Sequence, residues 1–416
     1  MISSREQRGC CAPNLLYESW EKQQKNTYDV NKNPRGIVNL GTAENKLTFD
    51  LIQPKLSSCD LGIVSESLTH YCNFTGTDDF RLKLCKFFTH FMKPVVSISP
   101  NDVYVVNGCG VAIETLGMIC CNEGEAMLIP APYYKAFDGD LGQRFLTKSY
   151  PVHLSMSNGF TLEVAQLQNA YDEAKKIGII IKGVLVSNPI NPLGVSYTRD
   201  QIKSYLEFCL RNNLHFVCDE IYTLSVYDKN EIFTSLLSMD NIDKYLHLIH
   251  VVWGFSKDFG LSGFRCGVII TFNKQVQMSL ASQAYFVTVP TITQFILSTV
   301  INDLNWVESF MTTNHKRLLQ SRDIVVNELE SADISYLLPT CGLFLCFNVS
   351  KYLIKNTRKA ELALFEEFMR RGVYIVPGSY LEFDEPGWFR IIISDEIDRL
   401  LVGVRRIIET LNCVER

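Results

Sequence analysis

A lysine amine and an arginine lie close together in residues 250–267, which read HVVWGFSKDFGLSGFRCG. Lys257 follows Ser256 at the end of an apolar stretch, and Arg265 comes eight residues after the lysine. A lysine amine forms a Schiff base with a carbonyl group, and an arginine binds the oxygens of a phosphate. Pyridoxal 5′-phosphate (PLP) carries both groups, so the run is compatible with a PLP site. Considered by itself, the run is explained equally well by an exposed Ser-Lys-Asp turn.

A carboxylate ends a second apolar stretch, at Asp219 in FVCDEIY. A buried carboxylate is costly unless it is paired, so Asp219 needs a partner. That partner is either within the protein, as a helix cap or an ion pair, or is the protonated pyridine nitrogen of PLP. Tyr222, three residues on, is either a partly buried aromatic residue or a donor to the phenolic oxygen of the cofactor.

Turn-forming residues follow two further apolar stretches. Asn191 lies in SNPINPLG, where its amide is suited to the same phenolic oxygen, although Asn-Pro turns are common. Gly108, Cys109 and Gly110 separate an expected strand from an expected helix. They form either a simple tight turn or a cradle in which backbone N–H groups bind phosphate.

Two aromatic residues and one arginine complete the candidates. Tyr133 and Tyr134 follow a strand end in IPAPYYKAF, where one of them stacks on a flat ring or both pack in the core. Arg390 lies amid apolar residues in EPGWFRIII and therefore needs an anionic partner. The α-carboxylate of a substrate and a salt bridge between domains are the two interpretations.

The elements that position these residues alternate along the chain. Apolar stretches typical of strands occur at 103–110, 126–132, 183–194, 214–222, 247–255 and 265–272, with helical patterns between several of them, and 79–92 is a further expected helix. This alternation predicts an α/β fold with a mostly parallel sheet that is buried on both faces. Ligands bind at the carboxyl ends of such strands, so we expect the polar clusters to meet in one crevice.

The chain of 416 residues is long enough for two or three domains. From about residue 285 helices dominate and short strands follow, which indicates a smaller α+β domain. We expect an N-terminal segment over 1–48 that joins the small domain, a large domain over 49–285 and the small domain over 286–416.

Composition excludes several classes of protein. The net charge of −5 gives no attraction to nucleic acid, and no apolar run is long enough to span a membrane. The start of the chain has no hydrophobic signal region, so we expect a cytoplasmic protein with reduced cysteines. The 14 cysteines are scattered, Cys10 and Cys11 among them, and no CxxC pair occurs, so we predict no metal site.

In this order the segments resemble fold-type I PLP enzymes of the class-I aminotransferase family, in particular 1-aminocyclopropane-1-carboxylate (ACC) synthase and its animal homologues. The resemblance spans residues 39–394 and is carried by NLGTAENKLTFDLI, TGTDDFR, IPAPYYKAFDGDL, IKGVLVSNPINPLG, VCDEIY, FSKDFGLSGFRCG and VPGSYLEFDEPGWFRIIIS. It implies a large domain with a seven-stranded sheet, PLP as cofactor, an amino acid as substrate, and a homodimer with sites at the subunit interface.

The resemblance also implies a role for each residue. Lys257 would hold PLP and move the proton at the substrate α-carbon, with Asp219 and Tyr222 as further catalytic residues. The cofactor would be bound by Asp219 at the ring nitrogen, Asn191 and Tyr222 at the phenolic oxygen, Tyr134 rather than Tyr133 on the ring, and Ser256, Arg265, Cys109 and Gly110 at the phosphate. Arg390 would bind the substrate carboxylate, with Ala43 and Glu44 near the substrate.

Three departures from the family pattern affect the expected activity. The phosphate loop NGCG lacks the usual Ser or Thr hydroxyl, and Gly254 stands where serine is common. Phe74 replaces a tyrosine of plant ACC synthases that reaches the neighbouring subunit's site. We therefore expect PLP-dependent aminotransferase chemistry at the α-carbon of an amino acid. A true ACC synthase that acts on S-adenosylmethionine, and a PLP-binding protein with little turnover, remain as alternatives.

Overall fold

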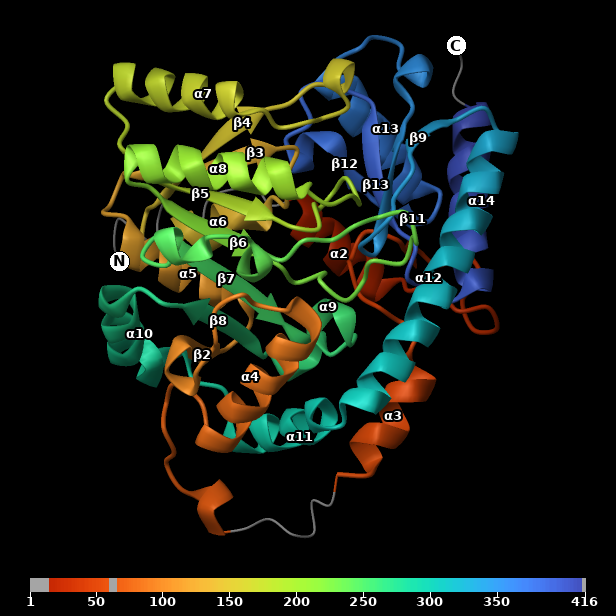
Figure 1. The fold of residues 1–416 in the computed structure, drawn as a ribbon. Helices are drawn as coiled ribbons and strands as arrows, with labels where there is room; N and C mark the ends of the chain where they lie inside the picture. The colour runs from red at the N-terminus through yellow and green to blue at the C-terminus, as the bar shows by residue number, and fades with distance from the viewer. Residues whose placement is uncertain (1–14, 60–65, 414–416) are drawn as a thin grey trace, which may run out of the picture.

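The structure is a computed structural model that describes residues 15–59 and 66–413. Cys10 and Cys11 of the scattered cysteines lie outside these residues, and the other twelve are free. Figure 1 shows a large sheet with helices on both sides and a smaller sheet packed beside it. The long helix α12 (Leu304–Ser331) runs from the helices below the large sheet to the small sheet.

The large sheet has seven strands and confirms the prediction of a mostly parallel α/β architecture. Only β8 runs antiparallel to its neighbours, β2 and β7. In spatial order the strands are β2 (Val103–Val106), β8 (Gly267–Thr271), β7 (Ile249–Gly254), β6 (His215–Asp219), β5 (Ile181–Ser187), β3 (Ala126–Ala131) and β4 (Lys148–His153).

Both faces of this sheet are buried, because the central strands and β2 place residues in two different apolar clusters. Val103 and Val105 of β2 pack on one face, whereas Tyr104 and Val106 pack on the other. The first face is covered by α4 (Asp78–Met92), α7 (Val164–Lys176) and α8 (Arg199–Asn212). The second face is covered by α5 (Cys109–Cys120), α6 (Ala136–Gly142) and α10 (Lys274–Val287).

The smaller sheet is antiparallel and has the order β12 (Val376–Pro377), β13 (Trp388–Ile392), β10 (Phe344–Asn348) and β9 (Ser335–Leu337). The remaining helices are α2 (Leu15–Lys25), α3 (Phe49–Ser57), α9 (Phe255–Asp258), α11 (Thr291–Asn302), α13 (Arg358–Arg370) and α14 (Ile397–Cys413).

The N-terminal segment pairs with the last third of the chain. Strand β1 (Val38–Asn39) runs parallel to β11 (Val373–Tyr374), and Leu40 is buried in the same cluster as the small sheet. The predicted domain limits at residues 48 and 285 stay predictions.

Most expected elements occur where the sequence places them, including the helix at 79–92 and strands that overlap all six predicted ranges, although β5 begins at Ile181, before its range. Edge strand β4 was not among those ranges. Its sequence, KSYPVH, is partly polar and contains a proline, which is tolerated at an edge.

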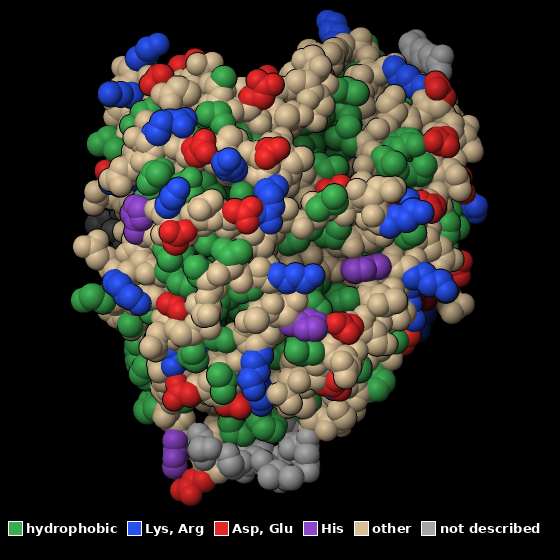
Figure 2. All heavy atoms as spheres, in the orientation of Figure 1, with side chains coloured by type: hydrophobic (Ala, Val, Ile, Leu, Met, Phe, Trp, Pro, Cys, Tyr) green, Lys and Arg blue, Asp and Glu red, His purple; other side chains and the backbone are tan. Residues whose placement is uncertain are grey.

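No helix within 15–59 and 66–413 is by itself long and apolar enough to cross a membrane. The pair α10 and α11 reaches that length and composition only together, with a bend of 115° between them. Acidic and basic side chains are interspersed over the face drawn in Figure 2, in keeping with the small net charge.

Candidate active site

The carboxyl ends of β5, β6 and β7 bring several predicted residues to one edge of the large sheet. Strand β6 ends at Asp219 and lies between β5 and β7. Strand β7 leads directly into the short helix α9, which carries Ser256 and Lys257. Asn191 lies in the loop that follows β5. The strand ends therefore bring these chemically active side chains to one region of the sheet.

Lys257 lies beneath the N-terminal segment. Its Nζ donates to the backbone carbonyl of Ala43 at 2.5 Å. Burial, and after it the nearby charge of Arg390, lower the pKa of the amine to about 8, although Glu44 opposes the shift. The neutral amine is the nucleophilic form, so Lys257 is more reactive near neutral pH than an exposed lysine.

The helix that carries the lysine is held by its neighbour, Asp258. One carboxylate oxygen of Asp258 accepts from the Ser225 hydroxyl at 2.7 Å. The other accepts from the backbone N–H of Leu224 at 3.1 Å and from Trp253 Nε1 at 3.3 Å. Because Asp258 is fully buried, these donors stabilise its carboxylate and fix the position of Lys257 at the strand end.

Asp219 is buried, and its Oδ1 has no hydrogen-bond partner among the described residues. Burial raises the pKa of this carboxyl to about 7, despite a hydrogen bond from the backbone of Ile221. An unpaired oxygen of this kind needs a donor, preferably a charged one. The protonated nitrogen of a pyridine ring would supply that donor.

A cradle for an anion lies at the start of α5. Gly108 precedes the helix with a φ of 95°, and a Cβ built on it would lie 2.6 Å from Nη2 of Arg265. The guanidinium of Arg265 therefore stands over the N-terminal N–H groups of α5, while its Nη1 donates to the carbonyl of Ser262. Ser256 is buried, and its hydroxyl has no partner among the described residues. These groups suit a phosphate.

Gly254 and Cys109 are packed against each other beside this cradle. A Cβ built on Gly254 would lie 2.7 Å from Cys109 Sγ and 2.9 Å from the carbonyl oxygen of Cys266. The thiol of Cys109 thus fills the space that a side chain at position 254 needs. Gly110, the other predicted phosphate ligand of this loop, is the second residue of α5 and lies against Asp140.

Arg390 is a buried cation with no acidic partner in the described part of the chain. Its Nη1 donates to Asn191 Oδ1 at 3.2 Å, and its Nη2 donates to the carbonyl of Gly41 at 2.6 Å. Its Nε has no hydrogen-bond partner within 15–59 and 66–413. Neutral acceptors do not balance a buried guanidinium, so the site is suited to an anionic ligand such as a carboxylate. The domain-interface salt bridge considered above is not present.

Asn191 contacts this arginine directly, and Tyr222 shares a neighbour with it. The ring of Tyr222 is buried and meets that of Phe344 edge to face at 5.3 Å, while Arg390 lies 5.7 Å from the centre of the Phe344 ring. Asn191 uses its carbonyl oxygen for Arg390, so its amide N–H groups stay available for a ligand.

The two tyrosines after β3 differ in their surroundings. Tyr133 is buried, and its hydroxyl donates to Asp138 at 2.6 Å. Tyr134 is 39% exposed, and its ring packs edge to face against Phe137 at 5.6 Å. Tyr134 is therefore the more accessible of the two rings, which favours it over Tyr133 as a stacking residue.

Ala43 and Glu44 lie next to the lysine and the phosphate cradle. The carbonyl of Ala43 accepts from Lys257, and a carboxylate oxygen of Glu44 accepts from the Ser262 hydroxyl at 3.1 Å. Ser262 is also the residue that orients Arg265, so the N-terminal segment contacts both the amine and the phosphate cradle.

Sequence reasoning missed Asp140, which lies against the cradle. A Cβ on Gly110 would lie 3.0 Å from its Oδ1, and no hydrogen bond links Asp140 to another described residue. Burial, and after it the charge of Glu114, raise the pKa of this carboxyl to about 7. The only sequence signal was its place six residues after Tyr134, within the FDGDL run.

The residues present fit PLP. Asp219 offers an unpaired oxygen for a ring nitrogen, Lys257 an amine for the carbonyl, and the start of α5 with Arg265 and Ser256 a cradle for phosphate. Each of these groups has unfilled hydrogen-bonding capacity in the protein alone, which a charged ligand would use.

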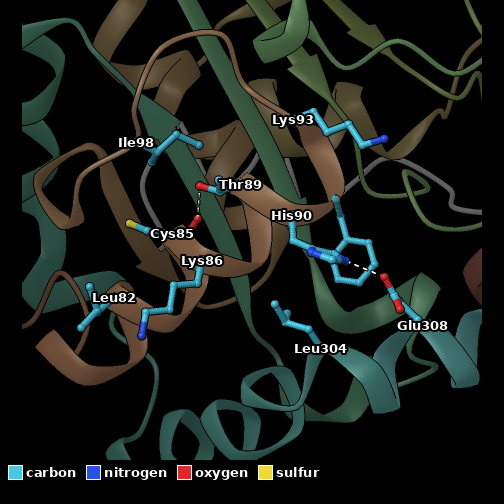
Figure 3. A pocket seen from close by; sticks show the side chains of 10 residues that line it. Leu82, Cys85, Lys86, Thr89, His90, Lys93, Ile98, Leu304 and Glu308 are labelled. Carbon is cyan, nitrogen blue, oxygen red and sulfur yellow. Dashed lines mark hydrogen bonds and ion pairs between the residues drawn. The ribbon is translucent and has the colours of Figure 1, made fainter.

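A separate groove of about 970 Å³ lies between α4 and α12. Figure 3 shows His90 directed toward Glu308 across it, with Leu304 beside them, and the two side chains are 2.7 Å apart. None of the residues that line the groove is among the predicted site residues. The candidate site is therefore the group of side chains around Lys257.

Comparisons with known proteins agree with this geometry. The family described as aminotransferase class I and II matches residues 37–404. The chain is 34% identical to human 1-aminocyclopropane-1-carboxylate synthase-like protein 1 over 95% of this chain and 80% of that protein. It is 35% identical to the human probable inactive 1-aminocyclopropane-1-carboxylate synthase-like protein 2, over 95% and 71%. It is 36% identical to 1-aminocyclopropane-1-carboxylate synthase 11 of Arabidopsis thaliana, over 92% and 85%.

Solved structures show the same fold. Thermus thermophilus aspartate aminotransferase with maleate superposes with a TM-score of 0.81 over 99% of both chains, at 18% identity. Aspartate aminotransferase from Thermotoga maritima gives a TM-score of 0.78 over 99% of this chain and 100% of that chain, at 22% identity. At these identities the likeness concerns the fold.

Proposed function

This chain belongs to the class I and II aminotransferase family, and we propose that it is a PLP-dependent enzyme that acts at the α-carbon of an amino acid. The proposed net reaction is of the aminotransferase type. The observation that carries the proposal is the set of unpaired groups around Lys257. Asp219 Oδ1 and Arg390 Nε are buried without partners in the part of the chain that the structure describes, and they suit the ring nitrogen of the cofactor and the carboxylate of an amino acid.

PLP supplies an electron sink for negative charge that develops at the α-carbon of the substrate. Lys257 would hold the cofactor covalently, and its free amine would take the proton from the substrate α-carbon and deliver it elsewhere. Its lowered pKa suits this task, because a base works best when its pKa lies near the working pH. Asp219 would keep the ring nitrogen protonated, and Arg390 would orient the substrate through its carboxylate so that the α-proton faces Lys257.

We also propose a homodimer whose interface includes an exposed aromatic patch. The patch consists of Tyr71, Phe74, Tyr285 and Phe286, whose rings contact one another in series at 5.3–5.8 Å. Tyr71 is 90% exposed and Phe286 is 74% exposed, which is unusual for large apolar side chains on a monomer. Location in the cytoplasm stays a prediction from sequence.

ACC synthase activity is a second candidate, supported by the 36% identity to the Arabidopsis thaliana synthase. Phe74 argues against it, since the hydroxyl of the plant motif is missing and the Phe74 ring packs against Tyr285 at 5.4 Å. Incubation of the purified protein with S-adenosylmethionine and an assay for ACC decide between the two activities. A Phe74→Tyr variant serves as the matched gain-of-function control.

The decisive test combines spectroscopy and turnover. The purified protein should show a visible cofactor band near roughly 420 nm that disappears in Lys257→Ala. A panel of amino acids, each with a 2-oxo acid acceptor, should then identify substrates that change this spectrum. A protein without the band contradicts the cofactor assignment. A band that no amino acid changes favours a PLP-binding protein with little turnover.

A further inference from the structure

Three potential metal ligands meet at the other end of the strands that carry the candidate active site. Cys120 is the last residue of α5, His215 is the first residue of β6, and His250 is the second residue of β7. One ligand atom from each lies within 4.8 Å of the other two. His215 begins β6 and Asp219 ends it. The cluster therefore lies at the opposite end of this strand from the candidate active site.

The two imidazoles are already positioned by hydrogen bonds. Nδ1 of His215 lies 2.9 Å from Nε2 of His250, and Nδ1 of His250 lies 2.8 Å from the Thr271 hydroxyl. Thr271 is directly opposite His250 in the β7–β8 pair. When His250 donates its Nδ1–H to Thr271, the lone pair of Nε2 points into the cluster. A histidine that binds a metal commonly donates its other ring N–H to an outer acceptor, and here the Thr271 hydroxyl would take that role.

The cluster is buried at two of its three ligands. Cys120 and His250 are buried, whereas His215 is partly exposed. Solvent is therefore nearest to the cluster at His215.

We propose that Cys120, His215 and His250 bind a Zn²⁺ ion. One thiolate sulfur and two imidazole nitrogens are ligands that Zn²⁺ prefers, and a water molecule on the exposed side of His215 would complete a tetrahedral set. Binding releases the Cys120 thiol proton to solvent. It also replaces the hydrogen bond between the two rings, and the proton on His215 moves to its other nitrogen.

The absence of a CxxC pair predicted no metal site, but the cluster does not need one. Its ligands come from a helix end and two strand starts, which the parallel sheet brings together. The competing interpretation is a metal-free pair of hydrogen-bonded imidazoles packed against a thiol. The two interpretations differ in what Cys120 does, and this difference defines the test.

The test measures zinc bound to the PLP-loaded protein after chelator treatment and dialysis against buffered Zn²⁺, by mass spectrometry of the metal. Wild type should retain about one zinc ion per chain. Cys120→Ser and His250→Asn should lose it, whereas Cys121→Ser, which alters the adjacent buried thiol, should keep it. Thr271→Val should weaken binding by roughly 10- to 100-fold, because it removes the outer contact of His250.

Circular dichroism and cofactor content show whether each variant is folded. The proposal is overturned if the folded wild type retains no zinc, or if folded Cys120→Ser retains as much as wild type. Loss of zinc in Cys121→Ser overturns the assignment of Cys120. A proton-release measurement on the wild type is independent of any variant, and zinc addition without release of a proton contradicts thiolate ligation.

Discussion

The side chain of Cys109 occupies the space next to Gly254 where a β-carbon would otherwise lie, with 2.7 Å between that position and the sulfur. The sequence showed Gly254 only as a lost phosphate ligand. The structure shows that the glycine and the thiol are packed as a pair beside the phosphate cradle. The loss of a hydroxyl at 254 and the choice of cysteine at 109 are therefore linked.

This pairing predicts a non-additive double mutant. Gly254→Ser should destabilise the protein by about 1–3 kcal/mol, because the added atoms overpack the site. Combination with Cys109→Ala should recover part of this loss. The recovery of stability should be incomplete, because the carbonyl oxygen of Cys266 still lies 2.9 Å from the added carbon. Urea unfolding of the four proteins measures the coupling, and strictly additive effects would contradict the packing argument.

Asp219 should reduce the stability of the cofactor-free protein. A rise of its pKa from 3.8 to about 7 lowers the free energy of unfolding by roughly 4 kcal/mol when the carboxyl is ionised. This loss of stability is absent below about pH 4, grows as pH rises, and is complete above about pH 7. Asp219→Asn should therefore raise the melting temperature of apo-protein at pH 8 but have little effect near pH 4. PLP should reverse the order of the two proteins at pH 8, and equal apo stabilities at that pH would count against the argument.

The reactivity of Lys257 should follow a pKa near 8 rather than near 10.5. Only the neutral amine attacks a carbonyl, so the rate of covalent PLP attachment to apo-protein should rise with pH up to about 8 and level off above it. Borohydride trapping at each pH measures this rate. Arg390→Gln should move the profile to higher pH, because the Arg390 charge helps to lower the Lys257 pKa. An unchanged profile in that variant would refute the coupling.

Arg390 should contribute more to substrate binding than to cofactor binding. Loss of a charged hydrogen bond costs about 1.5–3 kcal/mol, so Arg390→Lys should lower kcat/KM for amino acids by roughly 10- to 150-fold, with most of the change in KM. Cofactor content should be retained. Arg322→Lys is the matched control, because Arg322 is also buried but pairs with Asp228 at 2.8 Å. Equal effects of the two substitutions on KM would contradict substrate binding by Arg390.

Much of the fold could be predicted from the sequence, because it rests on local patterns. Apolar stretches that alternate with helical ones indicated the parallel sheet, and polar residues at strand ends indicated the crevice around Lys257 and Asp219. The reversed direction of β8 was not accessible in this way, since apolar stretches carry no sign of direction.

The features that were missed depend on contacts between distant segments. Asp140 lies beside Gly110 only because α6 packs against α5, and no spacing in the sequence marks that contact. The fit of Gly254 to Cys109 and the cluster of Cys120 with two histidines arise in the same way. Sequence patterns identify residue types at element ends, whereas packing decides which of them touch.

The segment that covers Lys257 has a consequence for how the protein folds during its synthesis. The carbonyl of Gly41 accepts a hydrogen bond from Arg390, and that of Ala43 accepts one from Lys257. Both residues follow β1, which pairs with β11 more than 300 residues later in the chain. This pairing cannot form until β11 has left the ribosome. Until then, a nascent chain with a folded large sheet would present an uncovered lysine, and firm retention of the cofactor would have to wait for β11.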